Sequence, residues 1–237
     1  MFEYSYSRLL AKINNLRMES RWIYPELIEA NEPDTFEGEL GTTGFETIRD
    51  ACVAEHGVPH HLKDFKNKQL RLVGYFQHLD YIYYDEPFIR SLWKTEPIEK
   101  RPSNEIVIHL RLGDYFDPGL RSVISPDWHE NILRQFGFSR RKSKLYIVVE
   151  DPNDLFLRNY HHYKPTIISQ SAKDDFNFIR SFDNIVCSNS SFCWWAAFLS
   201  EASKIYTFKP WLRFPADEHL NLADMRNATP VKGKFYK

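Results

Sequence analysis

Beyond residue 104 the chain alternates short apolar runs with longer amphipathic stretches, and this alternation limits the folds that it can adopt. The apolar runs favour β-strands at residues 105–110, 144–149, 184–188 and 204–208. The stretches between them predict helices at residues 125–136, 171–182 and 191–202. Strands that are apolar along their whole length, alternating with helices, predict a parallel sheet that is covered on both faces. We therefore expect an α/β fold for this part of the chain.

The preceding residues follow a less regular pattern. Apolar side chains recur at helical spacing in residues 1–16, which predicts a helix. An α/β domain normally begins on a strand, so this opening is unusual. Residues 69–76 predict a strand and residues 87–93 a helix, whereas residues 32–43 are acidic and have the glycine and proline of an exposed loop.

Residues 94–104 are polar and contain two prolines, which is typical of a linker. We place the domain boundary there, with an N-terminal domain at residues 1–98 and a C-terminal domain at residues 99–237.

Composition excludes several classes of partner. The formal net charge at pH 7 is −1, so no overall field recruits nucleic acid or a membrane surface. No apolar run approaches the length of a membrane span, and the N-terminus lacks the pattern of a signal peptide. The three cysteines show no metal-type spacing, and an odd count without a secretion signal favours reduced thiols. We therefore expect a cytoplasmic protein without a bound metal.

Three of the predicted strands end in polar residues. In a parallel sheet these ends lie on one edge, which is where ligands bind in open α/β sheets. The residues concerned are His109, Arg111, Gly113 and Asp114 after the first strand, Glu150 and Asp151 after the second, and Ser188, Asn189, Ser190 and Ser191 after the third. Three polar strand ends on one edge indicate a binding site.

The third strand end predicts an anion site. A short polar turn before a helix leaves backbone N–H groups unpaired at the helix start, and the helix dipole favours a phosphate there. Ser190 and Ser191 can add hydroxyl donors. The alternative is that one of these serines only caps the helix.

Arg111 strengthens the case for a phosphate, because its planar guanidinium can hold a diphosphate through two parallel hydrogen bonds. Gly113 permits close approach or an unusual backbone angle. Alternatively, Arg111 forms a local salt bridge with Asp114. His109 lies within the strand, so it is either part of the site or a hydrogen-bonded core histidine that orients Arg111 or a loop carbonyl.

Glu150 and Asp151 precede a predicted helix. They either cap that helix or accept hydrogen bonds from a nucleotide base or ribose. Of the two tryptophans that follow the serines, Trp194 and Trp195, at least one should pack the helix onto the sheet. Cys187 and Cys193 fit as small core side chains.

These motifs resemble those of the α-1,2-fucosyltransferases of glycosyltransferase family 11. "HLRLGDY" (109–115) resembles the family's His-x-Arg-Arg-x-Asp motif, and "SNSSFCWWAAFL" (188–199) resembles its Ser-Asn-Ser-Ser-Phe-Ser-Trp-Trp signature. "GYFQHLDYI" (74–82), "DDFNFIRSF" (174–182) and "FKPW" (208–211) are similar to further family segments in the same order. The resemblance covers nearly the whole chain.

The resemblance implies a GT-B-like architecture of two Rossmann-type halves with parallel sheets. The N-terminal half, here reduced, would face the acceptor and the C-terminal half would hold the sugar nucleotide. It also implies inverting transfer of L-fucose from GDP-fucose to a hydroxyl of an oligosaccharide, in α-1,2-type linkage, without a cofactor or an obligatory metal. A cytoplasmic transferase of this kind would act on a lipid-linked or otherwise accessible oligosaccharide, which leaves room for a peripheral membrane contact.

By motif match, Arg111 would hold the β-phosphate of GDP, with Ser190 and Ser191 beside the diphosphate and Asp175 near the nucleotide. Asn189 and Phe192 belong to the same signature and are carried over as donor-binding residues. Asp114 is the candidate base that deprotonates the acceptor hydroxyl, and a structural role in fixing the loop is the alternative for it.

The sequence departs from the family pattern at two places. Leu112 stands where the family usually has a second arginine, and the opening helix resembles one that follows a strand and a Gly-Gly-Leu-Gly-Asn-Gln loop, neither of which precedes it. Either the protein starts there or the chain lacks its first strand. Two alternative functions follow from these departures: a related transferase for another GDP- or UDP-sugar, and a non-catalytic module that binds a sugar nucleotide or glycan.

Overall fold

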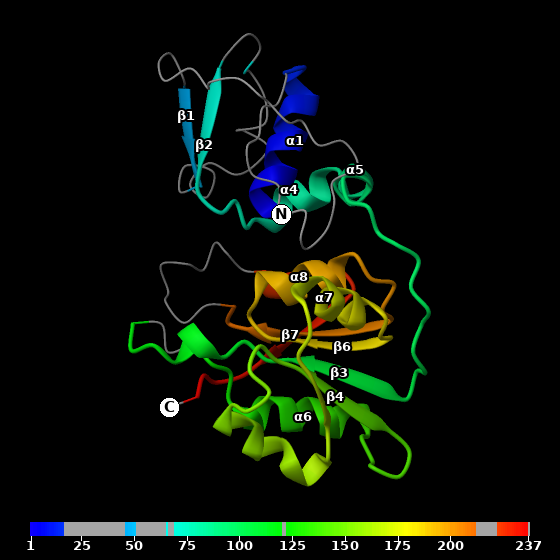
Figure 1. The fold of residues 1–237 in the computed structure, drawn as a ribbon. Coiled ribbons are helices and arrows are strands. Elements are labelled where there is room, and N and C mark those ends of the chain that lie inside the picture. Colours follow the sequence, from blue (N-terminus) through cyan, green and yellow to red (C-terminus); the bar gives the residue numbers. More distant parts are fainter. Residues whose placement is uncertain (17–45, 51–64, 66–68, 120–121, 212–221, 237) are drawn as a thin grey trace. The chain divides into compact units, whose positions relative to one another are not determined.

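The computed structural model describes residues 1–16, 46–50, 65, 69–119, 122–211 and 222–236 (Figure 1). They form two compact units, Met1–Thr95 and Glu96–Lys237. The loop expected at residues 32–43 lies outside the described residues.

The described residues of the first unit form three helices and a small sheet. The helices are α1 (Phe2–Asn14), α4 (Leu79–Tyr84) and α5 (Glu86–Ser91), and the strands are β1 (Glu46–Arg49) and β2 (Leu70–Val73). The two strands pair in parallel, with Glu46 opposite Leu70. The predicted strand at 69–76 ends early because Gly74 (φ +143°) and Phe76 (φ +51°) leave the extended conformation.

An aromatic cluster holds this unit together. The ring of Tyr6 on α1 stacks on Phe76 with centroids 4.6 Å apart, and it meets Tyr81 of α4 edge-on at 5.3 Å. All three side chains are fully buried, so this cluster fixes α1 against α4 and the segment after β2.

The second unit contains a six-stranded sheet in which every neighbouring pair is parallel. The strands are β3 (Glu105–His109), β4 (Lys144–Val148), β5 (Thr166–Ile168), β6 (Asn184–Cys187), β7 (Lys204–Lys209) and β8 (Ala228–Lys232). Their spatial order is β5-β4-β3-β6-β7-β8. The chain starts in the middle, builds outward to β5, and returns to build the other half from β6. The order therefore reverses between β3 and β6, as in nucleotide-binding Rossmann-like sheets.

Helices cover both faces of this sheet. Figure 1 shows α6 (Pro126–Phe136) on one face and α7 (Ala172–Arg180) with α8 (Ser191–Phe198) on the other. Short 3-10 helices are η1 (Gly113–Phe116), η2 (Leu155–Tyr163) and η4 (Leu222–Asp224). The side chains of β3 and β6 are buried along their whole length. The predicted α/β class and the doubly covered parallel sheet are confirmed.

Trp194 and Trp195 both lie inside this unit, with 0% and 2% of their surface exposed. Their rings meet edge-on at 5.2 Å, and the indole N–H of Trp194 donates to the carbonyl of Leu222. Cys187 and Cys193 are also fully buried, with the two sulfur atoms in contact. The tryptophans and cysteines of the signature are therefore packing residues.

Candidate functional site

The reversal of strand order places the ends of β3 and β6 next to each other, since these two strands are direct neighbours. This is the switch point at which nucleotides bind in doubly wound sheets. The residues after β3 and those after β6 form what we call the switch-point site.

His109 joins the two strand ends. Its Nδ1 atom lies 2.8 Å from the hydroxyl of Ser188, and its ring lies 5.5 Å from that of Phe192 on α8. Burial, with a smaller contribution from the charge of Arg111, lowers the pKa of His109 to about 3. The imidazole is therefore neutral at pH 7 and has the geometry of a hydrogen-bonded core histidine.

Arg111 lies between two carboxylates at the edge of the sheet. One guanidinium nitrogen is 2.8 Å from Asp114 Oδ1, and the other is 3.5 Å from Glu150 Oε2. The side chain remains 37% exposed, so an anion from solvent can reach it. The local salt bridge with Asp114, one of the two expected arrangements, is present in the structure.

The backbone conformation at Gly113 allows this arrangement. Its φ of +57° lies in the left-handed region, which other residues rarely adopt. The chain turns there into η1, and the turn brings Asp114 back beside Arg111. Leu112 is 5% exposed and belongs to the hydrophobic core. The position of the family's second arginine is therefore occupied here by a core side chain.

The serines after β6 begin α8. Ser190 occupies the N-cap position, yet its side chain makes no capping hydrogen bond, and Ser191 is the exposed first residue of the helix. The first backbone N–H groups of a helix have no partner within the helix. These groups and the serine hydroxyls together form the kind of helix start that binds phosphate.

Asn189 connects this turn to the rest of the unit. Its amide nitrogen donates to the carbonyl of Ser122 at 3.2 Å, whereas its Oδ1 atom is buried and has no hydrogen-bond partner among the described residues. Tyr115 was missed by sequence reasoning. Its hydroxyl donates to the carbonyl of Asn189 at 3.0 Å, and its ring lies 5.3 Å from the guanidinium of Arg111. The only signal in the sequence was its position directly after Asp114.

The remaining predicted residues lie on neighbouring loops. Glu150 follows β4 and is exposed, and its single described ion pair is with Arg111. Asp151 accepts from the backbone N–H of Asn153 at 2.8 Å, while the cap of η2 is Asp154. Asp151 therefore stabilises its own turn and is not the helix cap.

Asp175 lies in the first turn of α7, where its carboxylate accepts from the backbone N–H of Gln170 at 3.2 Å. Burial raises the pKa of Asp175, although the hydrogen bonds from Gln170 oppose the shift. The next residue, Phe176, contacts Phe192 edge-on at 5.6 Å. This contact connects the acidic start of α7 with α8.

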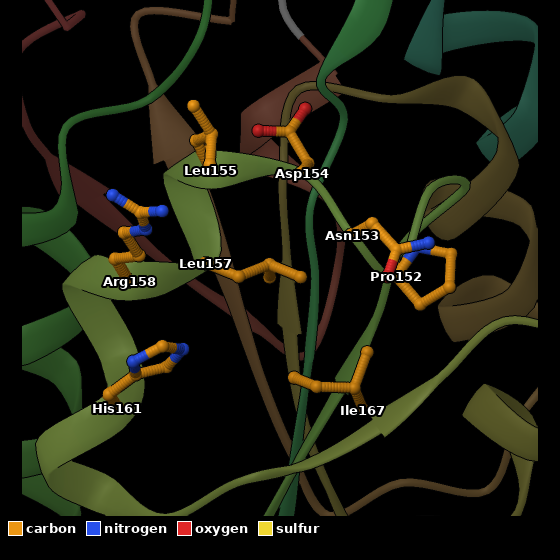
Figure 2. A pocket seen from close by; sticks show the side chains of 8 residues that line it. All are labelled: Pro152, Asn153, Asp154, Leu155, Leu157, Arg158, His161 and Ile167. Carbon is orange, nitrogen blue, oxygen red and sulfur yellow. The ribbon is translucent and has the colours of Figure 1, made fainter.

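A separate pocket lies beside η2 and β5, with Leu155 and Arg158 at one end and Pro152 at the other (Figure 2). Its volume is about 190 Å³, below the range of roughly 300–1,000 Å³ typical of small-molecule sites. None of the predicted site residues lines it. The switch point, which brings several of the predicted residues together, is therefore the candidate functional site.

Across the part of the chain that the structure describes, no group of three or more His, Cys, Asp or Glu side chains is arranged to hold a metal ion. Within the same residues, no helix has the length and apolar character needed to cross a membrane.

Comparison with known proteins identifies one family. The model of glycosyl transferase family 11 matches residues 39–225, which include all of the predicted site residues. No curated protein and no solved structure matches the chain.

The predicted cytoplasmic location is wrong. The family match contradicts it, because the fucosyltransferases of this family are typically Golgi or membrane-associated. The expectation relied on an odd cysteine count together with the lack of a secretion signal. Both described thiols, Cys187 and Cys193, are fully buried packing groups. Buried thiols report on packing and carry no information about the redox state of a compartment.

Because the family match spans most of the chain, the protein belongs to glycosyl transferase family 11, whose members are fucosyltransferases.

Proposed function

We propose that the protein transfers L-fucose from GDP-fucose to a hydroxyl of an oligosaccharide, with inversion and in α-1,2-type linkage. The proposal rests on the positions of Arg111, just after β3, and of the start of α8, just after β6, because these two strands are neighbours. Tyr115 connects the two, since its ring faces Arg111 and its hydroxyl donates to the carbonyl of Asn189. A cation and a helix N-terminus on adjacent strand ends can hold the two phosphates of GDP.

The proposed reaction is a single displacement. As the bond between fucose and the β-phosphate breaks, negative charge grows on the leaving GDP. Arg111 and the N–H groups of α8 would stabilise that charge more strongly in the transition state than in the ground state, and this difference accelerates the step. Arg111 and these N–H groups would supply the stabilisation, so the proposal needs no metal.

Asp114 has two proposed roles. It is the candidate base for the acceptor hydroxyl, and in the structure it forms an ion pair with Arg111. This ion pair favours a positioning role for Asp114, because its carboxylate fixes the arginine that is proposed to bind phosphate. The Asp114→Asn variant distinguishes the two roles. If Asp114 is the base, the variant loses a titrating group from the pH profile of kcat. If Asp114 positions Arg111, the variant mainly has a higher KM for GDP-fucose.

The architecture proposed is GT-B-like, with the nucleotide on the unit Glu96–Lys237 and the acceptor on the unit Met1–Thr95. The six-stranded parallel sheet of the second unit supports the first part of this proposal.

A transfer assay tests the proposal. The protein is incubated with GDP-fucose and a panel of galactosides, and the fucosylated product is identified by mass spectrometry and NMR. The Arg111→Ala variant should be slower by about a hundredfold or more, as when a donor that stabilises a developing oxyanion is lost. The Arg111→Lys variant is the matched control, because it keeps the charge but not the planar fork, and it should retain an intermediate rate. Transfer at the wild-type rate by Arg111→Ala contradicts the assignment.

A second candidate is transfer from another sugar nucleotide, and the buried Leu112 favours it because the site then has only one of the family's two arginines. Thermal unfolding with GDP and with UDP distinguishes the two. A ligand at a hundred times its Kd stabilises the fold by about 2.7 kcal/mol. Stabilisation by GDP alone supports the main proposal, and stabilisation by UDP alone supports the second. Stabilisation by GDP without any transfer supports a binding module.

A further inference from the structure

The turn that follows β2 is held in an unusual conformation. Two of its three residues have positive φ angles, Gly74 at +143° and Phe76 at +51°. The left-handed region is sparsely populated by residues other than glycine, so Phe76 adopts it only because its surroundings require it. Strained turns of this kind are concentrated at binding and catalytic sites.

Asp50 holds the turn in place. Its Oδ2 atom accepts hydrogen bonds from the backbone N–H groups of Tyr75 at 3.2 Å and Phe76 at 3.0 Å, while its Oδ1 atom lies 2.6 Å from Nε2 of His78. At Gly74, a Cβ atom would lie 2.3 Å from Cβ of Asp50, so this position accepts no larger residue.

Phe76 anchors the turn from the inside. Its ring is fully buried and stacks on Tyr6, whose hydroxyl is buried and has no hydrogen-bond partner among the described residues. Tyr75, which lies between Gly74 and Phe76, is therefore fixed by Asp50 on one side and by the aromatic cluster on the other.

This fixed residue, Tyr75, points its side chain into solvent. It is 74% exposed, the largest exposed fraction among the described large hydrophobic side chains, and its ring contacts no other ring within the described residues. Tyr4, Tyr6 and Tyr81 of the same unit are buried. The exposed ring of Tyr75 therefore does not stabilise the fold. Because its backbone is rigid, less conformational entropy is lost when a ligand binds the ring.

Tyr75 also lies at the edge of the sheet where ligands bind. Asp50 directly follows β1 and Gly74 directly follows β2, and these two strands are parallel. The turn therefore occupies the carboxyl edge of the small sheet, the edge on which α/β sheets bind their ligands.

We propose that Tyr75 is an acceptor-binding residue, on whose ring a sugar ring of the acceptor oligosaccharide stacks. The C–H groups on the apolar face of a sugar carry partial positive charge, and the face of an aromatic ring is negative, so the two surfaces attract each other while apolar area is buried. This inference rests on the proposed function, because it takes the acceptor to be a glycan.

The test compares steady-state kinetics of the full chain with lactose as the acceptor. Tyr75→Ala should raise KM for lactose about tenfold, equivalent to 1.4 kcal/mol, and leave KM for GDP-fucose unchanged. Tyr75→Phe keeps the ring and should stay within about twofold of the wild type. The matched control is Tyr84→Ala, because Tyr84 is also exposed (47%) and lies on α4 of the same unit.

A second readout separates this inference from the proposed function. Saturation-transfer NMR reports directly on lactose bound to the full chain, whether or not transfer occurs. Loss of the saturation signal in Tyr75→Ala, with the signal kept in Tyr84→Ala, supports the stacking role even if GDP-fucose is not the donor. Unchanged KM and unchanged NMR signal in Tyr75→Ala overturn the role, even if wild-type transfer is confirmed. A wild-type chain that neither transfers to lactose and related galactosides nor binds them overturns it as well.

Discussion

The chemistry proposed for the switch-point site depends on Arg111, whose two carboxylate partners differ in distance and exposure. Asp114 is three residues away in the sequence and lies 2.8 Å from the guanidinium, whereas Glu150 comes from the end of β4, lies at 3.5 Å and has a side chain that is 83% exposed. The proposed diphosphate would share Arg111 with these two groups. The exposed and more distant Glu150 is the partner that it displaces most easily.

Glu150→Gln should therefore strengthen the binding of GDP. Exposed ion pairs contribute roughly 0.2–1 kcal/mol, so releasing Arg111 from this one should lower the Kd for GDP by a factor of about 1.4 to 5. Isothermal titration calorimetry measures the change, and Glu201→Gln, on a residue exposed after α8, is the control for the loss of one negative charge. A weaker affinity in Glu150→Gln would mean that Glu150 contacts the nucleotide itself.

Two buried histidines make the stability of the second unit depend on pH. Burial lowers the pKa of both His109 and His129 to about 3 from 6.5. Both are neutral in the fold, so the unfolded chain binds more protons below pH 6.5. Stability is complete above pH 6.5 and falls as the pH decreases towards 3, by at most about 1.4 kcal/mol per pH unit for each histidine.

His129 allows this pH dependence to be tested without changing the switch-point site, because it lies on α6 and its hydrogen bond is with Tyr160. His129→Gln should weaken the dependence of the urea midpoint on pH between 6.5 and 5, whatever it does to the stability at pH 7. Equal pH dependence in the variant and the wild type would show that His129 is not buried in its neutral form.

Among the elements, α7 and α8 start in different ways although both begin after a serine. Ser171 accepts a hydrogen bond from the backbone N–H of Asp174 at 3.1 Å, whereas Ser190 caps no N–H group of α8. The first serine stabilises its helix. The second leaves its helix start available for an anion.

The corresponding alanine variants should therefore have opposite effects. Ser171→Ala should reduce the free energy of unfolding by about 1 kcal/mol, the usual cost of a lost cap, and leave GDP binding unchanged. Ser190→Ala should change stability less and weaken GDP binding. Chemical denaturation and calorimetry on the two variants measure both quantities, and a larger stability loss in Ser190→Ala would restore the capping role for Ser190.

Elements with a strong local signal could be predicted from the sequence. The central strands β3, β4, β6 and β7 are continuous apolar runs, and the helix predicted at residues 171–182 is present as α7. The strand β5 was missed because it is only three residues long. The strand β8 was missed because it is only partly buried and contains a proline, which an edge strand tolerates. The helix α4 was missed because it is six residues long.

Conformations that depend on distant residues could not be predicted. The φ angle of Phe76 depends on the carboxylate of Asp50, which lies 26 residues earlier in the chain. Likewise, the hydrogen bond from Tyr115 to the carbonyl of Asn189 spans 74 residues. The sequence identified the residues at the ends of β3 and β6, but the contacts between them follow from the strand order, which local patterns do not contain.

On the scale of the whole molecule, the strand order is the feature that brings the site together. The first strand of the sheet, β3, lies beside the fourth, β6, so residues more than seventy positions apart meet at one edge. Family membership adds that the sheet belongs to a fucosyltransferase. The sheet and the family together support a nucleotide diphosphate as the ligand of this edge.

The binding of GDP, measured by calorimetry on the wild type and on Arg111→Ala, tests whether Arg111 holds the β-phosphate of the nucleotide. GMP, which lacks the β-phosphate, is the matched ligand. The wild type should bind GDP more tightly than GMP, and Arg111→Ala should lose about tenfold or more in affinity for GDP but little for GMP. Equal affinities of the two proteins for GDP would contradict this role of Arg111.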